Sequence, residues 1–295
     1  MLKEFGPVGV IGLGNMGGAM STNLIKDGFE IYGADPVAEK CEALTKAGGT
    51  ALNNACEVAK RCRYIIMSLP SYGAFNAVSA DLAESCENGT IILETSTMPI
   101  ELKLQAQKLL AGHGIILLDA PLSGTGAQAK NKDLVVLGSG DKEAYEKCIP
   151  IINGFARSEY FLGDFGNGMK MKFVANQLVA IHNVAAAEAV LFGTRMGMDP
   201  DMVVKVIGDG AGSSRMFQVR GPVMVKRTWS QTQISNNVFH KDIVLIEEAL
   251  EDFGCPSPLF SASIPIYTAA RASGHGEDDT SSVFEILERM TKGPE

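Results

Sequence analysis

The sequence predicts an α/β, doubly wound parallel-sheet domain followed by an all-α domain, with a long helix joining the two. Up to residue 163, short apolar runs alternate regularly with helical patterns, as in parallel sheets covered by helices. After Gly163-Asp164 only helical patterns follow, and Gly166 to Phe192 keeps helical spacing without a break. We therefore expect one domain over residues 1–163 and a second over residues 164–295.

The length and amino-acid composition are those of an ordinary globular protein that can form two domains. Of the 295 residues, 46% are hydrophobic and 20% are charged. The net charge of −8, without a basic cluster, argues against nucleic acid as a partner. The 6 cysteines form no C-x-x-C pair, and the 4 histidines add no metal-ligand spacing, so we expect free thiols and no metal.

We expect a cytoplasmic protein that makes no use of a membrane. The first residues enter a strand directly, without the leader of a signal peptide. The longest apolar run, Leu178 to Phe192, contains His182, Asn183 and Glu188, which disfavour a membrane span. Helices this apolar in a small domain favour a covering partner chain, so a homodimer or homotetramer is expected.

The first element is a strand, a glycine turn and a helix. Val8 to Ile11 is a β-branched run, and a helical pattern follows the glycines through Ile25. A Rossmann-type dinucleotide site needs this order: one glycine permits the turn, a second lets the backbone approach the pyrophosphate, and a third allows close helix packing. The predicted cofactor-binding residues are Gly12, Leu13, Gly14, Asn15, Met16 and Gly17.

The second strand, Phe29 to Ala34, ends in Asp35, roughly twenty residues after the glycines. An acid there accepts hydrogen bonds from the adenosine ribose hydroxyls. No arginine follows within a few positions to receive a 2′-phosphate, which favours NAD over NADP. The alternative is that Asp35 merely caps a helix over residues 37–47.

The later strands place more side chains at the same edge of the sheet. Residues 63–69, closed by Pro70, form one strand, and residues 90–94 and 114–119 form two more, with a helix over 100–110. Ligands of such sheets bind beyond the carboxyl ends of the strands, where Leu69, Pro70 and Thr97 emerge. Residues 133–140 and 158–162 are further strands, with a helix over 142–153 between them.

The segment after Asp119 contains Ser123, Gly124 and Thr125. Small residues with free amides and hydroxyls at a strand end can surround a carboxylate. An ordinary glycine and serine turn explains the same residues equally well.

The long helix carries two polar residues one turn apart, Lys172 and Asn176. Near a helix start and partly desolvated, a lysine has a lowered pKa and can exchange protons at neutral pH. The alternative is a lysine that extends along the helix to water beside a hydrogen-bonded core amide. The expected apolar face comprises Met169, Phe173, Leu178, Ile181, Ala185 and Val190.

The C-terminal half is expected to be helical throughout. Helical patterns cover residues 200–208, 216–226, 237–253, 261–271 and 281–290. Phe239 to Asp242 falls at the start of the pattern over 237–253, and the residues alone favour a solvated N-terminal turn in which Asp242 interacts with the helix dipole.

With these motifs in this order, the chain resembles the β-hydroxyacid dehydrogenase family over essentially its whole length. This family includes 3-hydroxyisobutyrate dehydrogenase and tartronate semialdehyde reductase and is related to 6-phosphogluconate dehydrogenase. The most specific part of this resemblance is Gly166-x-Gly168-x-x-x-Lys172-x-x-x-Asn176, which is similar to the catalytic signature of the family.

The resemblance implies a role for each matching residue. Lys172 is implied as the general acid and base, with Asn176 binding the substrate. Thr125 stands where the family usually has glycine, which bears on the substrate, and Glu94 stands where aspartate is common. The other implied contacts are Ser123 and Gly124 for the substrate carboxylate, Leu69, Pro70 and Thr97 for the cofactor, Lys241 beside the nicotinamide, and Asp242 in support of Lys241.

The resulting hypothesis is an NAD(P)-dependent dehydrogenase, with NAD favoured, that acts on a small 3-hydroxy acid or its semialdehyde. An alternative is an imine or keto-acid reductase of the glyoxylate or succinic semialdehyde type on the same fold. Because imine-reducing members usually lack this lysine, Lys172 argues against the imine version. A third hypothesis is a non-catalytic dinucleotide-binding or chromatin-associated module, which the intact Lys172 and Asn176 disfavour.

Overall fold

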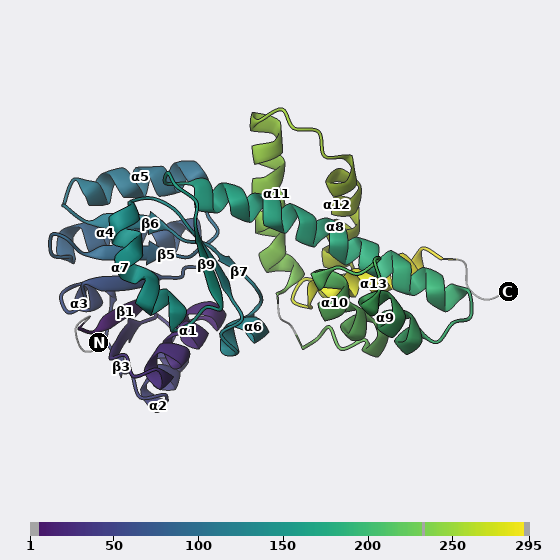
Figure 1. Cartoon of the computed structure of the whole chain (residues 1–295), viewed down its shortest axis with the longest axis horizontal. Helices are drawn as coiled ribbons and strands as arrows, with labels where there is room; N and C mark the ends of the chain where they lie inside the picture. Colours follow the sequence, from purple (N-terminus) through teal and green to yellow (C-terminus); the bar gives the residue numbers. More distant parts are fainter. Residues whose placement is uncertain (1–5, 232–233, 292–295) are drawn as a thin grey trace. The chain divides into compact units, whose positions relative to one another are not determined.

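The computed structural model describes residues 6–231 and 234–291, and the chain divides into two compact units, residues 1–172 and 173–295. The first unit is built on a parallel six-stranded sheet in the order β3-β2-β1-β4-β5-β6 (Figure 1). Its strands are β1 (Val8–Ile11), β2 (Ile31–Ala34), β3 (Thr50–Ala51), β4 (Tyr64–Met67), β5 (Ile91–Glu94) and β6 (Ile116–Asp119). The doubly wound sheet predicted from the alternation is confirmed, and its order reverses between β1 and β4.

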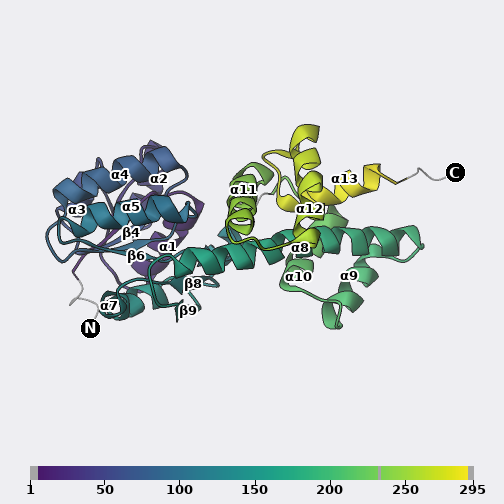
Figure 2. The ribbon, with the colours of Figure 1, turned by 90° about the horizontal axis from the view of Figure 1, so that it is seen from above.

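Helices cover both faces of this sheet, because its central strands are apolar on both sides. One face packs against α1 (Asn15–Lys26), α2 (Ala38–Lys46) and α7 (Lys142–Asn153), and the other against α3 (Ala55–Ala59), α4 (Tyr72–Ser85) and α5 (Ile100–Ala111). Figure 2 shows α4 and α5 on one side of the sheet and α7 on the other. Successive residues of β4 alternate between the two cores, with Ile66 in one and Ile65 and Met67 in the other.

A small second sheet follows in the same unit. It consists of β7 (Leu122–Ser123), β8 (Val135–Gly138) and β9 (Ser158–Phe161), with β7 antiparallel and β9 parallel to β8. The short helix α6 (Gly126–Lys130) lies between β7 and β8. The strands expected within 133–140 and 158–162 are therefore present, and an isolated bridge from Asp119 to Ser139 links them to the end of β6.

The long helix α8 runs from Asn167 to Arg195, as expected. Of the predicted apolar face, Met169 and Val190 are buried and Phe173 and Ile181 are half-buried, but the other two residues are exposed. Leu178 is 47% exposed, and Ala185 is exposed as well. The buried positions follow a three-and-four spacing that includes both polar residues of the motif. Among them are Met169, Lys172, Asn176, Ala180, Asn183, Ala187 and Val190, and Val184, Ala186 and Leu191 are buried as well.

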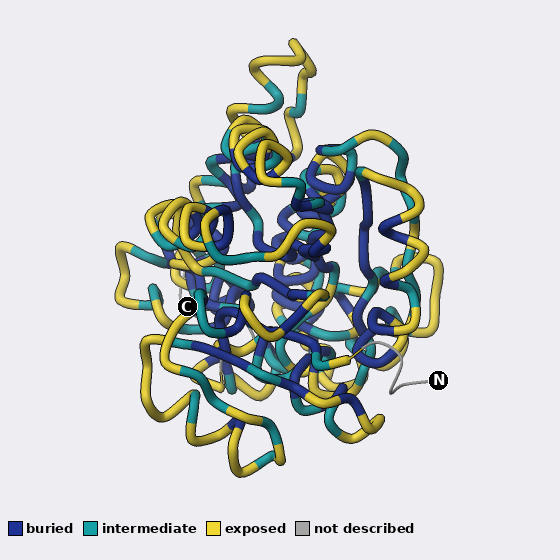
Figure 3. The backbone as a smooth tube through the Cα atoms, turned by 90° about the vertical axis from the view of Figure 1, so that its left-hand side faces the viewer, coloured by how far each residue is buried: buried dark blue, intermediate teal, exposed yellow. Residues whose placement is uncertain are grey.

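The second unit is helical, as predicted, over the residues that the structure describes. Its further α-helices are α9 (Pro200–Asp209), α10 (Arg215–Lys226), α11 (Asn236–Asp252), α12 (Pro258–Ala270) and α13 (Val283–Arg289), and short π- and 3-10 segments, η2 (Arg271–His275) and η3 (Thr280–Ser282), lie between the last two. A buried ion pair joins Arg220 to Asp279. Figure 3 colours the backbone of the whole chain by burial, with buried segments in dark blue and exposed turns in yellow.

By length and composition alone, α8 could cross a membrane. Asn183 in its middle is buried and donates hydrogen bonds to Tyr267 Oη (3.1 Å) and to the Thr280 carbonyl (2.9 Å). Residues on both sides of Asn183 belong to the apolar core of the second unit. These contacts are those of a core helix in a globular domain.

Candidate active site

The carboxyl ends of the parallel strands lie at one edge of the sheet. Ile11 pairs with Ala34 and Met67, and Glu94 pairs with Met67 and Asp119. The segments that follow β1, β2, β4 and β5 therefore start at this edge. They carry the predicted cofactor residues of the first unit, from Gly12 to Thr97.

The glycine turn after β1 has the geometry that a pyrophosphate site requires. Gly12 has a φ of +89°, and a Cβ there would lie 2.1 Å from the Ser68 carbonyl oxygen. A Cβ on Gly17 would lie 1.8 Å from the Gly12 carbonyl oxygen, so helix and turn are in direct contact. A Cβ on Gly14 would meet nothing within 4 Å.

The start of α1 is suited to an anion. Gly14 is its N-cap and supplies no side chain to the amides of the first turn, which begins at Asn15 and Met16. Open space at Gly14 and exposed amides at a helix N-terminus are the features that bind a diphosphate. The residues present therefore fit a dinucleotide cofactor.

Asp35 connects the glycine turn to the end of β2. Its Oδ2 accepts a hydrogen bond from the Leu13 amide (2.7 Å), and its Oδ1 accepts one from the Val37 amide (2.9 Å). The N-cap of α2 is Val37, so Asp35 is not the simple helix cap of the alternative interpretation. The carboxylate stands beside the phosphate turn, where a ribose hydroxyl can reach it.

The loops after β4 and β5 are joined by a serine. The Leu69 amide donates to Ser96 Oγ (2.8 Å), and the Ser96 amide donates to Glu94 Oε1 (2.7 Å). Leu69 and Thr97 are half-buried, while Pro70 is exposed. Ser96 was absent from the predicted site residues, and its position directly before Thr97 at a strand end was the available signal.

Ser123 and Gly124 form a tight bend, since Gly124 has a φ of +138° and a Cβ there would lie 2.7 Å from Leu134 Cδ2. Thr125 begins α6 in a capping box. Its hydroxyl accepts from the Gln128 amide (3.4 Å), and Gln128 Oε1 accepts from the Thr125 amide (3.0 Å). The Thr-x-x-Gln spacing already contains this signal. Thr125 and Gln128 thus have a structural role in holding the loop.

Lys172 and Asn176 are both buried, at 8% and 6% exposure, one turn apart on α8. Lys172 is therefore not a lysine that extends into open solvent. Asn176 Nδ2 donates to Asp242 Oδ2 (2.7 Å). This bond uses the amide nitrogen of Asn176 and does not involve its amide oxygen.

The prediction for Asp242 from the residues alone was wrong. The segment from Phe239 to Asp242 lies inside α11, whose N-cap is Ser235, and Asp242 is 6% exposed. It lies on the buried side of α11, where Phe239 and Ile243 belong to the apolar core of the second unit and Asn176 of α8 donates its hydrogen bond. Lys241, next to it, is half-buried.

Near the strand ends, the structure contains a buried charge cluster that the sequence did not indicate. Lys103 Nζ lies 2.6 Å from Glu94 Oε2 and 2.6 Å from Asp119 Oδ1, and all three side chains are fully buried. Among the residues described, no group of three or more His, Cys, Asp or Glu side chains has the arrangement of a metal site.

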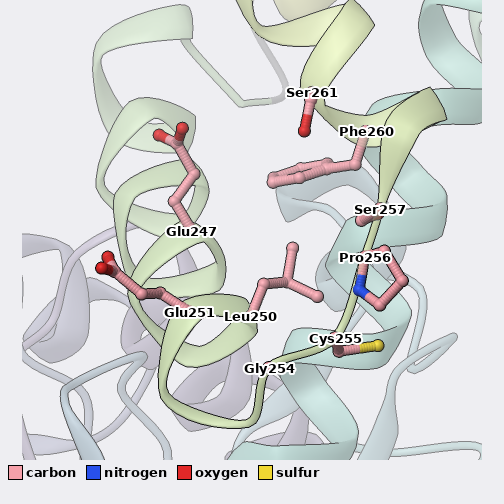
Figure 4. Close-up of a pocket in the computed structure, with 9 residues that line it drawn as sticks. All are labelled: Glu247, Leu250, Glu251, Gly254, Cys255, Pro256, Ser257, Phe260 and Ser261. Atoms are coloured by element: carbon pink, nitrogen blue, oxygen red, sulfur yellow. The ribbon is translucent and has the colours of Figure 1, made fainter.

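A cavity of about 700 Å³ lies in the second unit between the end of α11 and the start of α12. Figure 4 shows Leu250 and Phe260 lining it, with Glu247 and Glu251 on α11 and Cys255 on the connecting loop. Its lining contains none of the predicted site residues, so the strand ends and α8 remain the candidate site.

Two family models cover nearly the whole chain. The NAD-binding domain of 6-phosphogluconate dehydrogenase matches residues 7–163. The NAD-binding domain of NADP-dependent 3-hydroxyisobutyrate dehydrogenase matches residues 166–287.

Individual relatives are similar over the same length. The chain is 31% identical to L-threonate dehydrogenase of Cupriavidus necator, over 95% of each chain. It is 30% identical to glyoxylate/succinic semialdehyde reductase 1 of Arabidopsis thaliana, over 95% of this chain and 98% of the relative. A crystal structure of 3-hydroxyisobutyrate dehydrogenase from Salmonella typhimurium superposes with a TM-score of 0.87 at 27% identity, over 95% and 99% of the two chains.

The fold, the phosphate turn and the matches to both halves agree with one another. The chain belongs to the β-hydroxyacid dehydrogenase family, a family of NAD(P)-dependent oxidoreductases.

Proposed function

We propose that this protein transfers hydride between NAD and a small 3-hydroxy acid or its semialdehyde, with Lys172 as the general acid and base. The observation that carries the proposal is the buried Lys172, one turn before a buried Asn176 on the helix that leaves the dinucleotide unit. A lysine kept from water is suited to proton exchange with a substrate hydroxyl. The activities of the threonate dehydrogenase and semialdehyde reductase relatives support the class of substrate.

In the proposed mechanism the protein supplies binding and proton transfer. The nicotinamide, when bound, supplies or accepts the hydride. Lys172 Nζ takes the hydroxyl proton during oxidation and returns one to the oxygen during reduction. Asn176, oriented by Asp242, binds the substrate oxygen, and the bend at Ser123 and Gly124 holds the substrate carboxylate through its amides and hydroxyl.

The glycine turn holds the pyrophosphate, and Asp35 holds the adenosine ribose. In this proposal Leu69, Pro70 and Thr97 line the nicotinamide side of the cofactor, and Lys241 interacts with the nicotinamide end. Asp35 supports NAD, because its charge would repel the 2′-phosphate of NADP.

We expect Asp35→Asn to shift the ratio of kcat/KM for NAD over NADP towards NADP by at least about tenfold. Asparagine retains an oxygen for the Leu13 amide while removing the negative charge. Glu39→Gln is the matched control, because it removes a nearby exposed charge in the first turn of α2. An unchanged ratio in Asp35→Asn would show that this carboxylate does not select the cofactor.

A keto-acid reductase of the glyoxylate or succinic semialdehyde type is the second candidate, and the Arabidopsis relative favours it. It needs the same residues, because reduction is the reverse of the proposed reaction. An imine reductase is less well supported, because imine-reducing members of the family usually lack the lysine that stands here at position 172.

The test of the proposal is a panel of substrates with NAD and NADP run in parallel. The acids are 3-hydroxyisobutyrate, glycerate, threonate, 3-hydroxypropionate and 4-hydroxybutyrate, with glyoxylate and succinic semialdehyde in the reducing direction. We expect turnover of at least one of them, with NAD preferred. Binding of NADH without turnover of any compound would instead favour a non-catalytic dinucleotide-binding module.

We further propose a homodimer or homotetramer. Large apolar side chains remain exposed at the end of α8 and on α9, among them Phe192 (67%), Met202 (52%) and Val206 (60%). Apolar groups gathered on a surface favour association between copies. Light scattering of the purified protein checks this, and a monodisperse monomer would contradict it.

The six free cysteines of the protein favour the reducing cytoplasm as its location, which cell fractionation can test.

A further inference from the structure

The buried cluster of Lys103, Glu94 and Asp119 has no part in the proposed chemistry. Lys103 comes from α5, and the two carboxylates end the neighbouring strands β5 and β6. Removing three charged groups from water carries a large desolvation cost, and a hydrophobic replacement is often as stable. The hydrogen bonds that the carboxylates make therefore bear on what the cluster does.

Asp119 holds the start of α8. Its Oδ2 accepts from the Met169 amide (2.9 Å) and from Ser139 Oγ (3.1 Å), and Ser139 Oγ in turn accepts from the Gly168 amide (3.0 Å). These are amides of the first helical turn, which have no partner within the helix. A carboxylate at this end also interacts favourably with the helix dipole.

The backbone of α8 is in close contact with this carboxylate. A Cβ on Gly168 would lie 2.8 Å from Asp119 Oδ2 and 2.4 Å from the Leu137 carbonyl oxygen. Lys172 follows Gly168 by one helical turn. Because a helical turn is rigid, the anchoring of Gly168 and Met169 determines the position of the Lys172 backbone, from which its side chain extends.

Glu94, the other carboxylate, holds the loops on the cofactor side. It accepts from the Ser96 amide, and Ser96 accepts from the Leu69 amide. Lys103 therefore connects the segment that starts α8 with the segments after β4 and β5. Both connections lie within the first unit.

We propose that Asp119, held in place by Lys103, is a positioning residue that sets Lys172 relative to the loops after β4 and β5. The role in catalysis rests on the proposed function. Asp119 acts through the first turn of α8, whose Met169 amide it accepts from directly and whose Gly168 amide it reaches through Ser139.

The charges of the cluster agree with this assignment. Burial raises the pKa of Glu94 above its ordinary value, despite the ammonium group of Lys103 beside it. Burial alone would lower the pKa of Lys103, but the two carboxylates outweigh it and the pKa lies above its ordinary value. Lys103 thus stays charged as the partner of Asp119.

The first test is Asp119→Asn. Lys103 donates to Asp119 Oδ1 and the Met169 amide donates to Oδ2, and asparagine can place an acceptor oxygen at only one of these two positions. We expect kcat to fall at least about tenfold while the Kd for NADH stays within about twofold. The control is Asp141→Asn, because Asp141 is the N-cap of α7 and asparagine caps a helix equally well.

A milder pair of variants covers the case in which Asp119→Asn does not fold. Ser139→Ala removes the oxygen that accepts from Gly168. Ser79→Ala is its matched control, because Ser79 is also buried in the first unit and its Oγ has no hydrogen-bond partner among the described residues. We expect kcat to fall about three- to tenfold in Ser139→Ala only.

Amide hydrogen exchange gives a readout that needs neither substrate nor cofactor. We expect exchange at Gly168 and Met169 to become at least about tenfold faster in Asp119→Asn and in Ser139→Ala, with the rest of the sheet unit unchanged. A merely structural role would instead lower protection and melting temperature throughout the unit.

Failure of the positioning role and failure of the proposed function give different results. An active wild type whose Ser139→Ala variant keeps both normal exchange at Gly168 and normal kcat would overturn the positioning role alone. A wild type that turns over no compound of the panel would remove the proposed function, and the catalytic role of Asp119 with it, even if the exchange results are as expected.

Discussion

Replacing Lys172 with alanine is expected to lower kcat by at least about a hundredfold, which corresponds to about 2.7 kcal/mol of transition-state stabilisation. The loss should fall on kcat, because the proposed proton transfer occurs only as hydride moves. The Kd for NADH should stay within about twofold, because the predicted cofactor contacts lie at the strand ends and at Lys241.

Lys170→Ala is the matched control for this variant. Lys170 lies on the same helix two positions earlier and is exposed. Its Nζ donates a hydrogen bond to Asn167 Oδ1 (3.2 Å). Loss of activity in both variants would indicate a general effect on α8. Near-normal kcat in Lys172→Ala alone would remove Lys172 from the mechanism, whatever the substrate.

The second large effect is expected from Gly14→Ala. The added methyl group meets nothing within 4 Å in the protein, and the φ of −64° at Gly14 suits alanine. The melting temperature should therefore stay close to that of the wild type. The same space is where the backbone would approach the pyrophosphate, so the Kd for NADH should rise at least about tenfold.

Two further alanine variants separate binding from folding. In Gly17→Ala the methyl group would lie 1.8 Å from the Gly12 carbonyl oxygen, so we expect a lower melting temperature as well as weaker binding. Gly208→Ala places a methyl group in open space on α9 and should change neither quantity. Fluorescence titration with NADH and thermal unfolding measure both, and wild-type affinity in Gly14→Ala would argue against a phosphate at this turn.

Much of the first unit could be predicted because its signals are local. The glycines after β1 and the alternation of short apolar strands with helices depend on neighbours in the sequence. Asp35 is recognisable in the same way, from its distance to the glycines and its place at a strand end. The capping box at Thr125 and Gln128 was an equally local signal, which the interpretation of the loop as a carboxylate site left unused.

The buried face of α8 could not be predicted in full from the sequence pattern. The helix is apolar on most sides, so its spacing did not distinguish the face with Leu178 and Ala185 from the one with Ala180 and Ala187. Its buried face depends on which helices pack against it. Those helices come from distant parts of the chain.

The sequence by itself determined the order of strands and helices, the phosphate turn, and the spacing of Lys172 and Asn176 on one helix. Only the tertiary structure decided which partners these residues have: Asp242 for Asn176, and Asp119 with Ser139 for the first turn of α8. Spacing along a helix or turn follows from backbone geometry, which neighbouring residues set. Pairing between buried polar groups depends on which distant segments pack together, because only there does a group removed from water find its partner.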